Sequence, residues 1–146
     1  MADVEVYNIL GVKYFDKDYE RDSYTELVEA PVSAISGVSE SDAADLRKAL
    51  KVKTVGDLAT NRYVQIAQAL TTFSNISTKI LDKKFESKEF KEIRKQPVSA
   101  IAGISRKSGE LLKKALGIDT IEELAENRYV KIAQITVTIA ALESIL

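Results

Sequence analysis

The chain contains no cysteine, no histidine and no tryptophan, and only two of its 146 residues are proline. Without cysteine there is no disulfide framework, no thiolate zinc or iron–sulfur site and no cysteine nucleophile. Without histidine the commonest general base and metal ligand is missing as well. Chemistry near neutral pH would depend on carboxylates, lysine or tyrosine. The composition therefore favours a protein that binds over one that catalyses.

Long apolar stretches are also missing. No run approaches the ~20 apolar residues that a membrane-spanning helix needs. The first residues lack the basic and then apolar pattern of a signal peptide, so we expect a cytoplasmic protein with no membrane partner. The 21 Lys and Arg residues almost balance the 22 Asp and Glu residues, which argues against a uniformly basic nucleic-acid binder.

One long segment of the chain occurs twice. Pro31–Gln68 returns as Pro97–Gln134, a shift of 66 residues, with 21 identities in 38 positions. A weaker likeness extends upstream, where Asp16–Lys17 faces Asp82–Lys83. Self-similarity at a fixed period is typical of a repeated structural unit. We therefore expect an internal duplication of two helical units of about 66 residues each.

The two expected units differ in charge. Residues 1–75 carry 8 basic and 12 acidic residues, a net charge of −4, whereas residues 76–146 carry 13 and 10, a net charge of +3. The near-neutral total is therefore the sum of an acidic unit, 1–75, and a basic unit, 76–146. We expect both to belong to one helical body.

Nearly every segment has the spacing of an amphipathic helix, so we expect an all-α protein. Residues 16–29 predict one exposed helix. Pro31 predicts the first position of a short helix, about 31–36, that ends near Gly37. A longer helix is expected to begin near Arg62. It places these apolar residues on one face: Tyr63, Ile66, Leu70, Phe73 and Ile76.

One stretch, residues 135–139, alternates β-branched residues with others and taken alone could be a strand. Its counterpart, residues 69–73, has no such pattern, so we expect a helix at both places. Ser105 and three capping-box patterns mark further helix starts. The three patterns are Ser39 with Asp42, Thr54 with Asp57, and Thr120 with Glu123.

Apolar positions that recur at the 66-residue shift predict the core. In the first unit they are Ile35, Leu46, Leu50, Leu58, Tyr63 and Ile66. In the second unit they are Ile101, Leu112, Leu116, Leu124, Tyr129 and Ile132. The tyrosines could also be imagined as platforms on which bases stack, but each follows an arginine at the start of an amphipathic helix, which favours burial.

A short helix, a turn with glycine and a second helix recur in both units. The segments Ile35–Ser39 and Ile101–Ser105, each followed by apolar residues at helical spacing, resemble the helix–hairpin–helix motif. The likeness is greatest to the Gly-Ile-Ser variety in the N-terminal domains of recombinases. The later segment Gly117–Ile121 is similar to the pattern too. The resemblance covers about 30 residues of each unit and implies binding to the DNA phosphate backbone without reading of sequence.

The physical basis of such a site is the start of the second helix, where free N–H groups and the helix dipole attract anions. The glycine allows a sharp turn and a close approach to a phosphate. The sequence departs from the family at Ser39 and Ser105, because the common hairpin is Gly-hydrophobic-Gly. A serine at this place narrows the approach and also caps the helix.

The two hairpins differ in the charge of the first helical turn. The first carries Glu40 and Asp42, which repel a phosphate, whereas the second carries Arg106 and Lys107. A bound phosphate would compensate these cations, although ordinary solvated surface charges remain an open interpretation. The residues expected to bind nucleic acid are Gly103, Ser105, Arg106, Lys107, Lys113 and Lys114. Arg62 and Arg128 are interpreted as residues whose stems cover the adjacent hairpin.

A protein–protein adaptor, or a scaffold that associates with itself, is the alternative function. Unlike charges allow the acidic half of one molecule to meet the basic half of another. The terminal helix also carries more apolar residues than one core-facing stripe requires. The residues expected at such an interface are Glu40, Asp42, Ile135, Ile139, Leu142 and Leu146.

An enzyme is not expected. The sequence contains no recognisable nucleophile–base pair and no GxxxxGKS phosphate loop. The acidic residues Glu122, Glu123 and Glu126 are read as a solvated helix face rather than a cation site. We therefore predict no catalytic residues, no metal and no cofactor. The partner is expected to be the backbone of DNA or RNA, another protein or a second copy of the chain.

Overall fold

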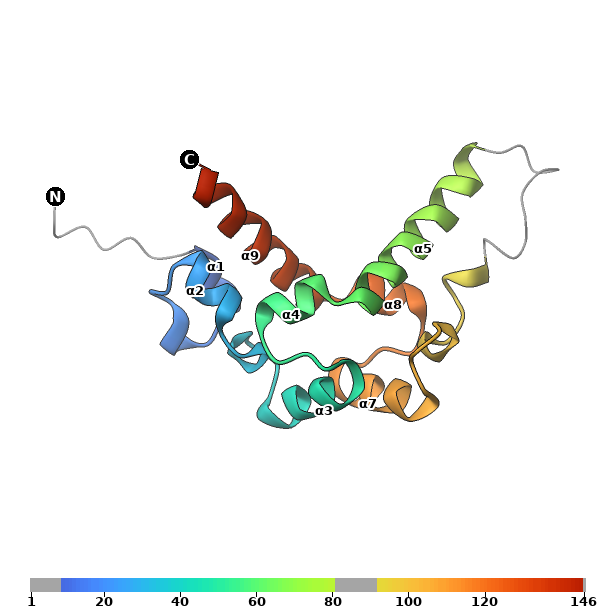
Figure 1. The fold of residues 1–146 in the computed structure, drawn as a ribbon, viewed down its shortest axis with the longest axis horizontal. Coiled ribbons are helices and arrows are strands. Elements are labelled where there is room, and N and C mark those ends of the chain that lie inside the picture. The colour runs from blue at the N-terminus through green and yellow to red at the C-terminus, as the bar shows by residue number, and fades with distance from the viewer. Residues whose placement is uncertain (1–8, 81–91, 146) are drawn as a thin grey trace, which may run out of the picture.

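The computed structural model describes residues 9–80 and 92–145, and these fold as helices joined by turns, with no strand (Figure 1). The expectation of an all-α fold is confirmed for this part of the chain. The α-helices are α1 Ile9–Tyr14, α2 Tyr24–Glu29, α3 Glu40–Leu50, α4 Val55–Thr60, α5 Arg62–Ile80, α7 Arg106–Leu116, α8 Ile121–Ala125 and α9 Arg128–Ile145. Three short 3-10 helices are η1 Lys17–Tyr19, η2 Val32–Ala34 and η4 Val98–Ala100. Among these helices none has the length and apolar character required to cross a membrane.

The helix starts are set by the predicted capping residues. Ser39 Oγ accepts a hydrogen bond from the N–H of Asp42 at 3.0 Å, and the Asp42 carboxylate accepts from the N–H of Ser39 at 3.2 Å. The same reciprocal pair begins α4 at Thr54 and α8 at Thr120. These bonds satisfy backbone donors that have no partner inside the helix. All three predicted capping boxes are confirmed.

Two local predictions are wrong. Residues 16–29 do not form one helix, because Ser23 starts α2 with its own capping box to Glu26 and separates it from η1. Pro31 does not begin a helix either. It is extended, with ψ near 150°, and forms an isolated β-bridge with Thr54 just before η2. The bridge holds the turn against the chain that enters α4.

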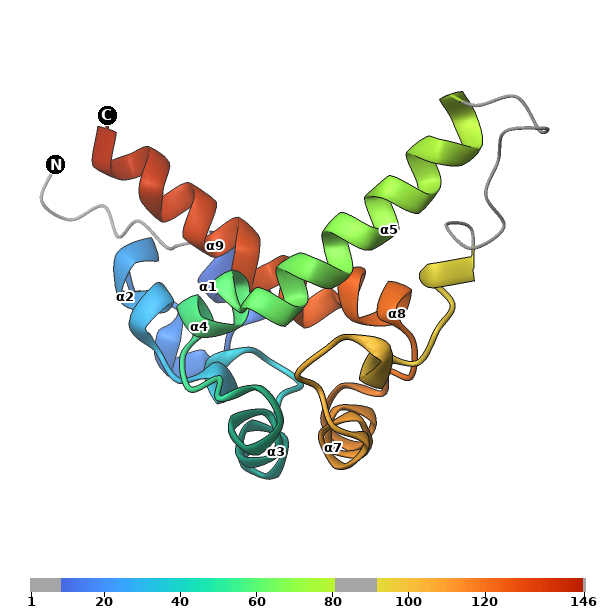
Figure 2. The same cartoon turned by 45° about the vertical axis from the view of Figure 1, so that its right-hand side comes forward.

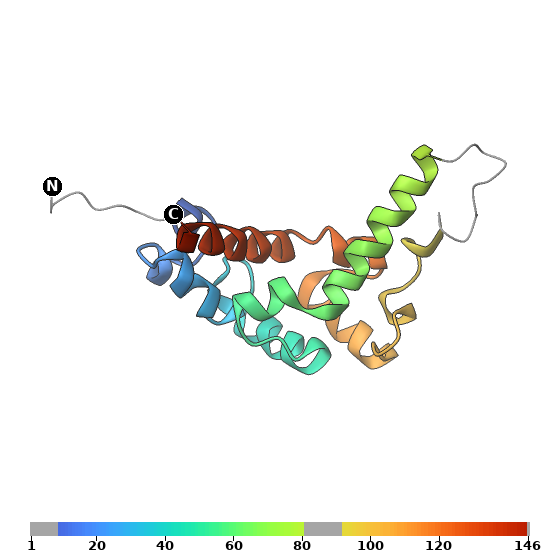
Figure 3. The ribbon, with the colours of Figure 1, turned by 45° about the horizontal axis from the view of Figure 1, so that its top comes forward.

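The long helices pack across the chain rather than within the expected units. α3 lies beside α7 (Figure 2), α5 packs on α8, and α9 packs on α4 and α2. α5 and α9 diverge from the centre as two arms, with α9 passing over α2 (Figures 1 and 3). The expected boundary at residue 75 falls inside α5.

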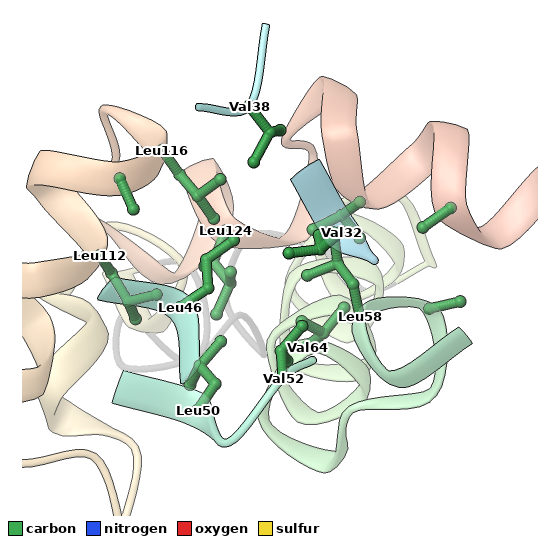
Figure 4. Close-up of a cluster of buried hydrophobic side chains, with 14 of the residues drawn as sticks. Val32, Val38, Leu46, Leu50, Val52, Leu58, Val64, Leu112, Leu116 and Leu124 are labelled. Atoms are coloured by element: carbon green, nitrogen blue, oxygen red, sulfur yellow. The ribbon is translucent and has the colours of Figure 1, made fainter. Parts of the chain in front are cut away.

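Leucines of α3, α4, α7 and α8 form the centre of the core (Figure 4). Leu46, Leu58, Leu112 and Leu124 are all completely buried, as the recurring positions predict. The prediction that Ile66 belongs to the core is wrong, because this residue is 40% exposed.

The face of α5 that packs inward carries Val64, Ala67, Thr71 and Ser74, all nearly or fully buried. Of the predicted apolar face, Ile66 and Phe73 therefore point outward, whereas Leu70 is partly buried against the core. Phe73 is 50% exposed. The tyrosines Tyr63 and Tyr129 are partly buried against the core. The side chain of Ile76 lies outside the described residues.

Candidate nucleic-acid interface

The two hairpins have the same backbone. Gly37 and Gly103 both have φ near +100°, a conformation that residues with a side chain rarely adopt. Each glycine is followed by a capping serine, and Ser105 Oγ accepts from the N–H of Ser108 at 3.0 Å. The predicted cap at Ser105 is confirmed. The hairpins thus lead the chain directly into α3 and α7.

Each hairpin glycine touches a tyrosine from the other half of the chain. A Cβ atom built on Gly103 would lie 2.5 Å from the hydroxyl oxygen of Tyr63, and one built on Gly37 would lie 2.5 Å from that of Tyr129. A side chain at either place would require the tyrosine to move. Glycine is therefore required here by a tyrosine as well as by the turn, a reason that the sequence alone does not supply.

An arginine accompanies each of these tyrosines. The guanidinium of Arg62 donates to the hydroxyl of Tyr63 and lies 4.7 Å from the centre of its ring. The guanidinium of Arg128 likewise stands over the ring of Tyr129, 5.3 Å from its centre. Such cation–π contacts fix an otherwise flexible cation in position. Arg62 is thereby held next to the hairpin of the second half.

A cleft of about 540 Å³ opens at this meeting point, which we call the junction cleft. It is lined by Lys48, Ala49, Leu50, Lys51, Asn61, Arg62, Tyr63, Gly103 and Ser108. Three of these side chains are cationic and none is acidic. All three cations come from the first half of the chain, and the hairpin comes from the second.

Helix geometry explains why these cations gather here. Lys48 lies in the last turn of α3, and Lys51 caps the helix in the left-handed conformation with φ 61°. The C-terminal end of a helix carries partial negative charge and favours cations. Arg62 begins α5, and the Asn61 side chain ties that start to α3 by donating to the Leu50 carbonyl at 3.1 Å. The local sequence therefore collects positive charge at one end of α3.

The residues predicted to bind nucleic acid are not all brought together. Gly103 lines the junction cleft, and Ser105 caps α7 beside it. Lys107 is exposed on the first turn of α7. Arg106 and Lys113 line a different hollow, of about 290 Å³, which also contains Glu110 and Asp119.

Lys113 and Lys114 have acidic neighbours. Lys113 Nζ lies 3.3 Å from Asp119 Oδ1, and Lys114 Nζ lies 4.0 Å from Oδ2 of Asp45, a buried residue of α3. The second contact joins the two halves of the molecule. Part of the positive charge expected at the second hairpin is therefore balanced inside the protein.

Lys48, Lys51 and Arg62 are the residues that sequence reasoning missed. Arg62 had a signal, because Asn-Arg-Tyr-Val recurs at residues 61–64 and 127–130. That signal pointed to the adjacent hairpin, whereas in the structure the arginine stands beside the hairpin of the other half. Lys48 and Lys51 gave no signal that distinguishes them from ordinary surface lysines.

The first hairpin does not have the same set of charges. At positions 66 residues apart, the first hairpin has Asp42 where the second has Ser108, and the second half has Gly117 where the first has Lys51. Asp42 is held by the capping box, and Glu40 accepts a hydrogen bond from Ser33 at 3.3 Å. Both acids expected at a partner interface therefore contact their own hairpin.

The other residues expected at a partner interface lie on α9. Ile135 is 49% and Leu142 51% exposed, whereas Ile139 is half-buried. Leu146 lies outside the described residues. The inner face of α9 is supplied by Val130, Ile132, Ala133 and Thr136, so Ile135 and Leu142 point away from the core.

The part of the chain that the structure describes contains no cluster of three or more acidic residues placed to hold a metal ion. Comparison of the chain with models of protein families, with curated proteins and with solved structures finds no match in any of the three. The interpretation of the junction cleft therefore depends on its own geometry and charge.

Proposed function

We propose that this is a tandem helix–hairpin–helix protein that binds the phosphate backbone of nucleic acid without reading its sequence and without catalysing a reaction. The proposed contact surface is the junction cleft. The observation that carries the proposal is the convergence of three cations, with no acid, on the exposed hairpin at Gly103. Internal duplication of a helix–hairpin–helix unit is part of the same proposal.

The chemistry of the cleft suits a phosphate. Lysine acts as a compact positive charge with three donors, and arginine offers several donors in a planar fork. Arg62 uses one edge of its guanidinium for Tyr63, which leaves other N–H groups for a ligand. Contacts of this kind position a nucleic acid without distinguishing its bases.

The proposal is tested by binding to a fluorescent DNA duplex and to a single strand over a series of salt concentrations. Affinity should fall steeply with salt because neutralised phosphates release counterions. The variant Lys48→Glu/Lys51→Glu should lose at least about tenfold in affinity, whereas Lys48→Gln should lower the salt slope by about 1. The matched control is Lys95→Glu/Lys131→Glu, which makes the same change of charge at exposed positions outside the cleft.

Two results would reject this function. One is no binding even at about 50 mM salt, where contacts to phosphate are strongest. The other is an equal loss of affinity in the control variant. A third variant, Arg106→Glu/Lys107→Glu, measures how much the first turn of α7 adds. Loss in that variant alone would move the contact surface from the junction cleft to the outer side of α7.

The second candidate function is association with a protein, through α9. Ile135, Leu142 and Ile145 are 49%, 51% and 78% exposed, and they recur along one helix at spacings of seven and three residues. Light scattering at low and high salt measures self-association directly. Leu142→Lys/Ile145→Lys should turn an α9-mediated dimer into a monomer. A strict monomer at both salt concentrations would exclude a scaffold that associates with itself.

A further inference from the structure

The turn before the first hairpin is covered by a short extended segment of the same chain. The N–H of Asp16 donates to the Ala34 carbonyl at 2.8 Å, and the N–H of Ser36 donates to the Tyr14 carbonyl at 2.8 Å. Phe15 and Ile35 form an isolated antiparallel bridge between these bonds. Residues 14–16 therefore bind along residues 34–36 as one strand binds along another.

The side chain at the centre of this segment belongs to the core. Phe15 is only 3% exposed, and Ala34 and Ile35 are buried in the same core cluster. The hydroxyl of Ser36 adds a bond to the Asp16 carboxylate at 3.2 Å. The first turn is thus closed by an aromatic residue, two backbone hydrogen bonds and one side-chain hydrogen bond.

The equivalent turn in the second half, residues 100–102, is open. Ala100 and Ala102 are exposed, whereas Ala34 is 1% exposed. Within the described residues, neither the N–H of Ala102 nor the carbonyl of Ala100 has a backbone partner outside its own turn. The edge that residues 14–16 occupy in the first half is therefore unoccupied by any described segment in the second.

An apolar hollow of about 370 Å³ lies along this open edge, and we call it the second-turn groove. Its apolar wall includes Ile66, Leu70, Ile93, Ala100, Ile101 and Ile121. In the 66-residue register Ile66 and Ile93 correspond to Ile132 and Leu27. Those counterparts are 8% and 0% exposed, against 40% for Ile66. The groove thus exposes apolar surface at positions whose counterparts in the other half of the repeat are buried.

We propose that the second-turn groove binds an extended segment of a partner protein, with one large apolar side chain seated in the hollow. The segment would pair with the Ala102 N–H and the Ala100 carbonyl, as residues 14–16 pair with the first turn. Addition of a strand to a free edge is a common mode of peptide recognition. The volume is sufficient for an aromatic ring, because a cavity of about 150 Å³ already holds benzene.

The structure also indicates what the groove does not require. Alanine stands at residue 102, where the first turn has Ser36, so the hydroxyl that binds the Asp16 carboxylate is missing. The groove therefore does not require the bound segment to carry an acidic residue after its large apolar residue. A second copy of the chain is a poor source of the segment, because its own Phe15 is buried and would have to be released.

The experiment uses the full chain and a fluorescent peptide of residues 10–20, Leu-Gly-Val-Lys-Tyr-Phe-Asp-Lys-Asp-Tyr-Glu, because its residues 14–16 pair with the first turn. Fluorescence anisotropy should show saturable binding. Phe15→Ala in the peptide should weaken it about tenfold or more, since buried aromatic anchors dominate such contacts. Asp16→Ala in the peptide should have little effect.

Ala100→Glu in the chain places a charge in the second-turn groove and should abolish binding. Ala141→Glu, an exposed position on α9, is the matched control and should bind as the unaltered chain does. Circular dichroism establishes that both variants are folded. Equal binding by the two variants, or no binding by the unaltered chain, overturns the proposal.

Two other occupants would be revealed by the same measurements. In the repeat register the counterpart of Phe15 is Leu81, which lies outside the described residues. Peptide binding that appears only after Leu81→Ser would assign the groove to this chain itself and overturn a partner in trans. A dimer in light scattering that the free peptide dissociates would assign it to a second copy, with the same consequence.

Discussion

Gln68 and Gln134 exchange a reciprocal pair of hydrogen bonds, in which the amide nitrogen of each donates to the amide oxygen of the other at 2.8 Å. The same nitrogens also donate to the carbonyls of Ala125 and Ala59, at 3.2 and 3.3 Å. The two glutamines are 66 residues apart and occupy equivalent positions in α5 and α9. They join the two arms where these cross, and each also holds the last turn of a short helix.

Gln68→Leu should lower the free energy of unfolding by about 1–3 kcal/mol, because it leaves partly buried polar groups without a partner. Gln134→Leu should cost a similar amount. The double variant should cost less than the sum, since the two side chains share one pair of bonds. Urea unfolding of the three variants measures this coupling. Strict additivity would show that the reciprocal bonds contribute nothing.

Gly103→Ala should be more harmful than an ordinary substitution at positive φ. The new Cβ would meet the Tyr63 hydroxyl, so we expect a loss of about 1–3 kcal/mol. Gly117→Ala is the control, because Gly117 has φ +69° but open space around it, and it should cost only about 1 kcal/mol. Tyr63→Phe should recover part of the Gly103→Ala loss. Equal losses at Gly103 and Gly117 in urea unfolding would contradict the steric argument.

Asp57 should make stability depend on pH in the acid range. Burial alone would raise the pKa of Asp57, but hydrogen bonds from the N–H groups of Thr54 and Lys53 and from the Thr54 hydroxyl lower it overall. A lowered folded-state pKa gives stability that is present above the unfolded value of about 3.9 and lost as the pH falls through the folded value.

Asp57→Asn should therefore cost about 0.5–1 kcal/mol at pH 7, and the difference from the unaltered chain should shrink below about pH 4. Thermal unfolding between pH 3 and 7 checks this. Glu110→Gln, which removes a carboxylate at an exposed site in the middle of α7, away from the cap, is the control. A gap that stays constant from pH 7 to pH 3 would mean that the charge of Asp57 plays no part in the cap.

Asp45→Leu should leave stability unchanged or raise it by about 1 kcal/mol. The Asp45 carboxylate is 8% exposed; among the described residues its Oδ2 atom has no hydrogen-bond partner, and Lys114 Nζ lies 4.0 Å from it. Leu111 occupies the equivalent place in α7, and Lys114, whose side chain is 70% exposed, stays solvated without its partner. Replacing a buried ion pair by apolar packing is often neutral or stabilising.

Lys114→Met is the complementary variant. It should cost about 0.5–1 kcal/mol, because the buried carboxylate of Asp45 loses the cation that lies 4.0 Å from it. Urea unfolding of both variants at pH 7 measures the contrast. A destabilised Asp45→Leu variant would show that the carboxylate serves the contact between α3 and α7 in its own right.

Local structure could be predicted where a few neighbouring residues decide it. Ser39, Thr54 and Thr120 start helices because their side chains reach a backbone N–H only three residues away. Gly37 and Gly103 end their turns for a similarly local reason, a positive φ. The single helix expected over residues 16–29 failed because the capping box at Ser23 outweighs a narrow apolar stripe.

The candidate site could be predicted only in part. Gly103 was expected, but Lys48, Lys51 and Arg62 belong to the other half of the chain and meet the hairpin only through cross-chain packing. Equally, nothing near Lys114 in sequence reveals that its neighbour is Asp45, a residue of α3. Basic residues that cannot be told apart in the sequence therefore differ in the structure, because each has different neighbours from distant parts of the chain.

By itself the sequence determined that the chain is helical, where most helices begin, and that two similar halves carry opposite net charge. These features depend on hydrogen bonds and periodicities that span a few residues, or on direct comparison of one half with the other. Only the tertiary structure decided that α5 and α9 each pack on the opposite half and that a tyrosine covers each hairpin glycine. It also decided that Phe15 pairs with one turn, whereas no described segment pairs with residues 100–102 of the other. Such pairings join residues far apart in the chain, and their choice depends on how whole helix faces fit together.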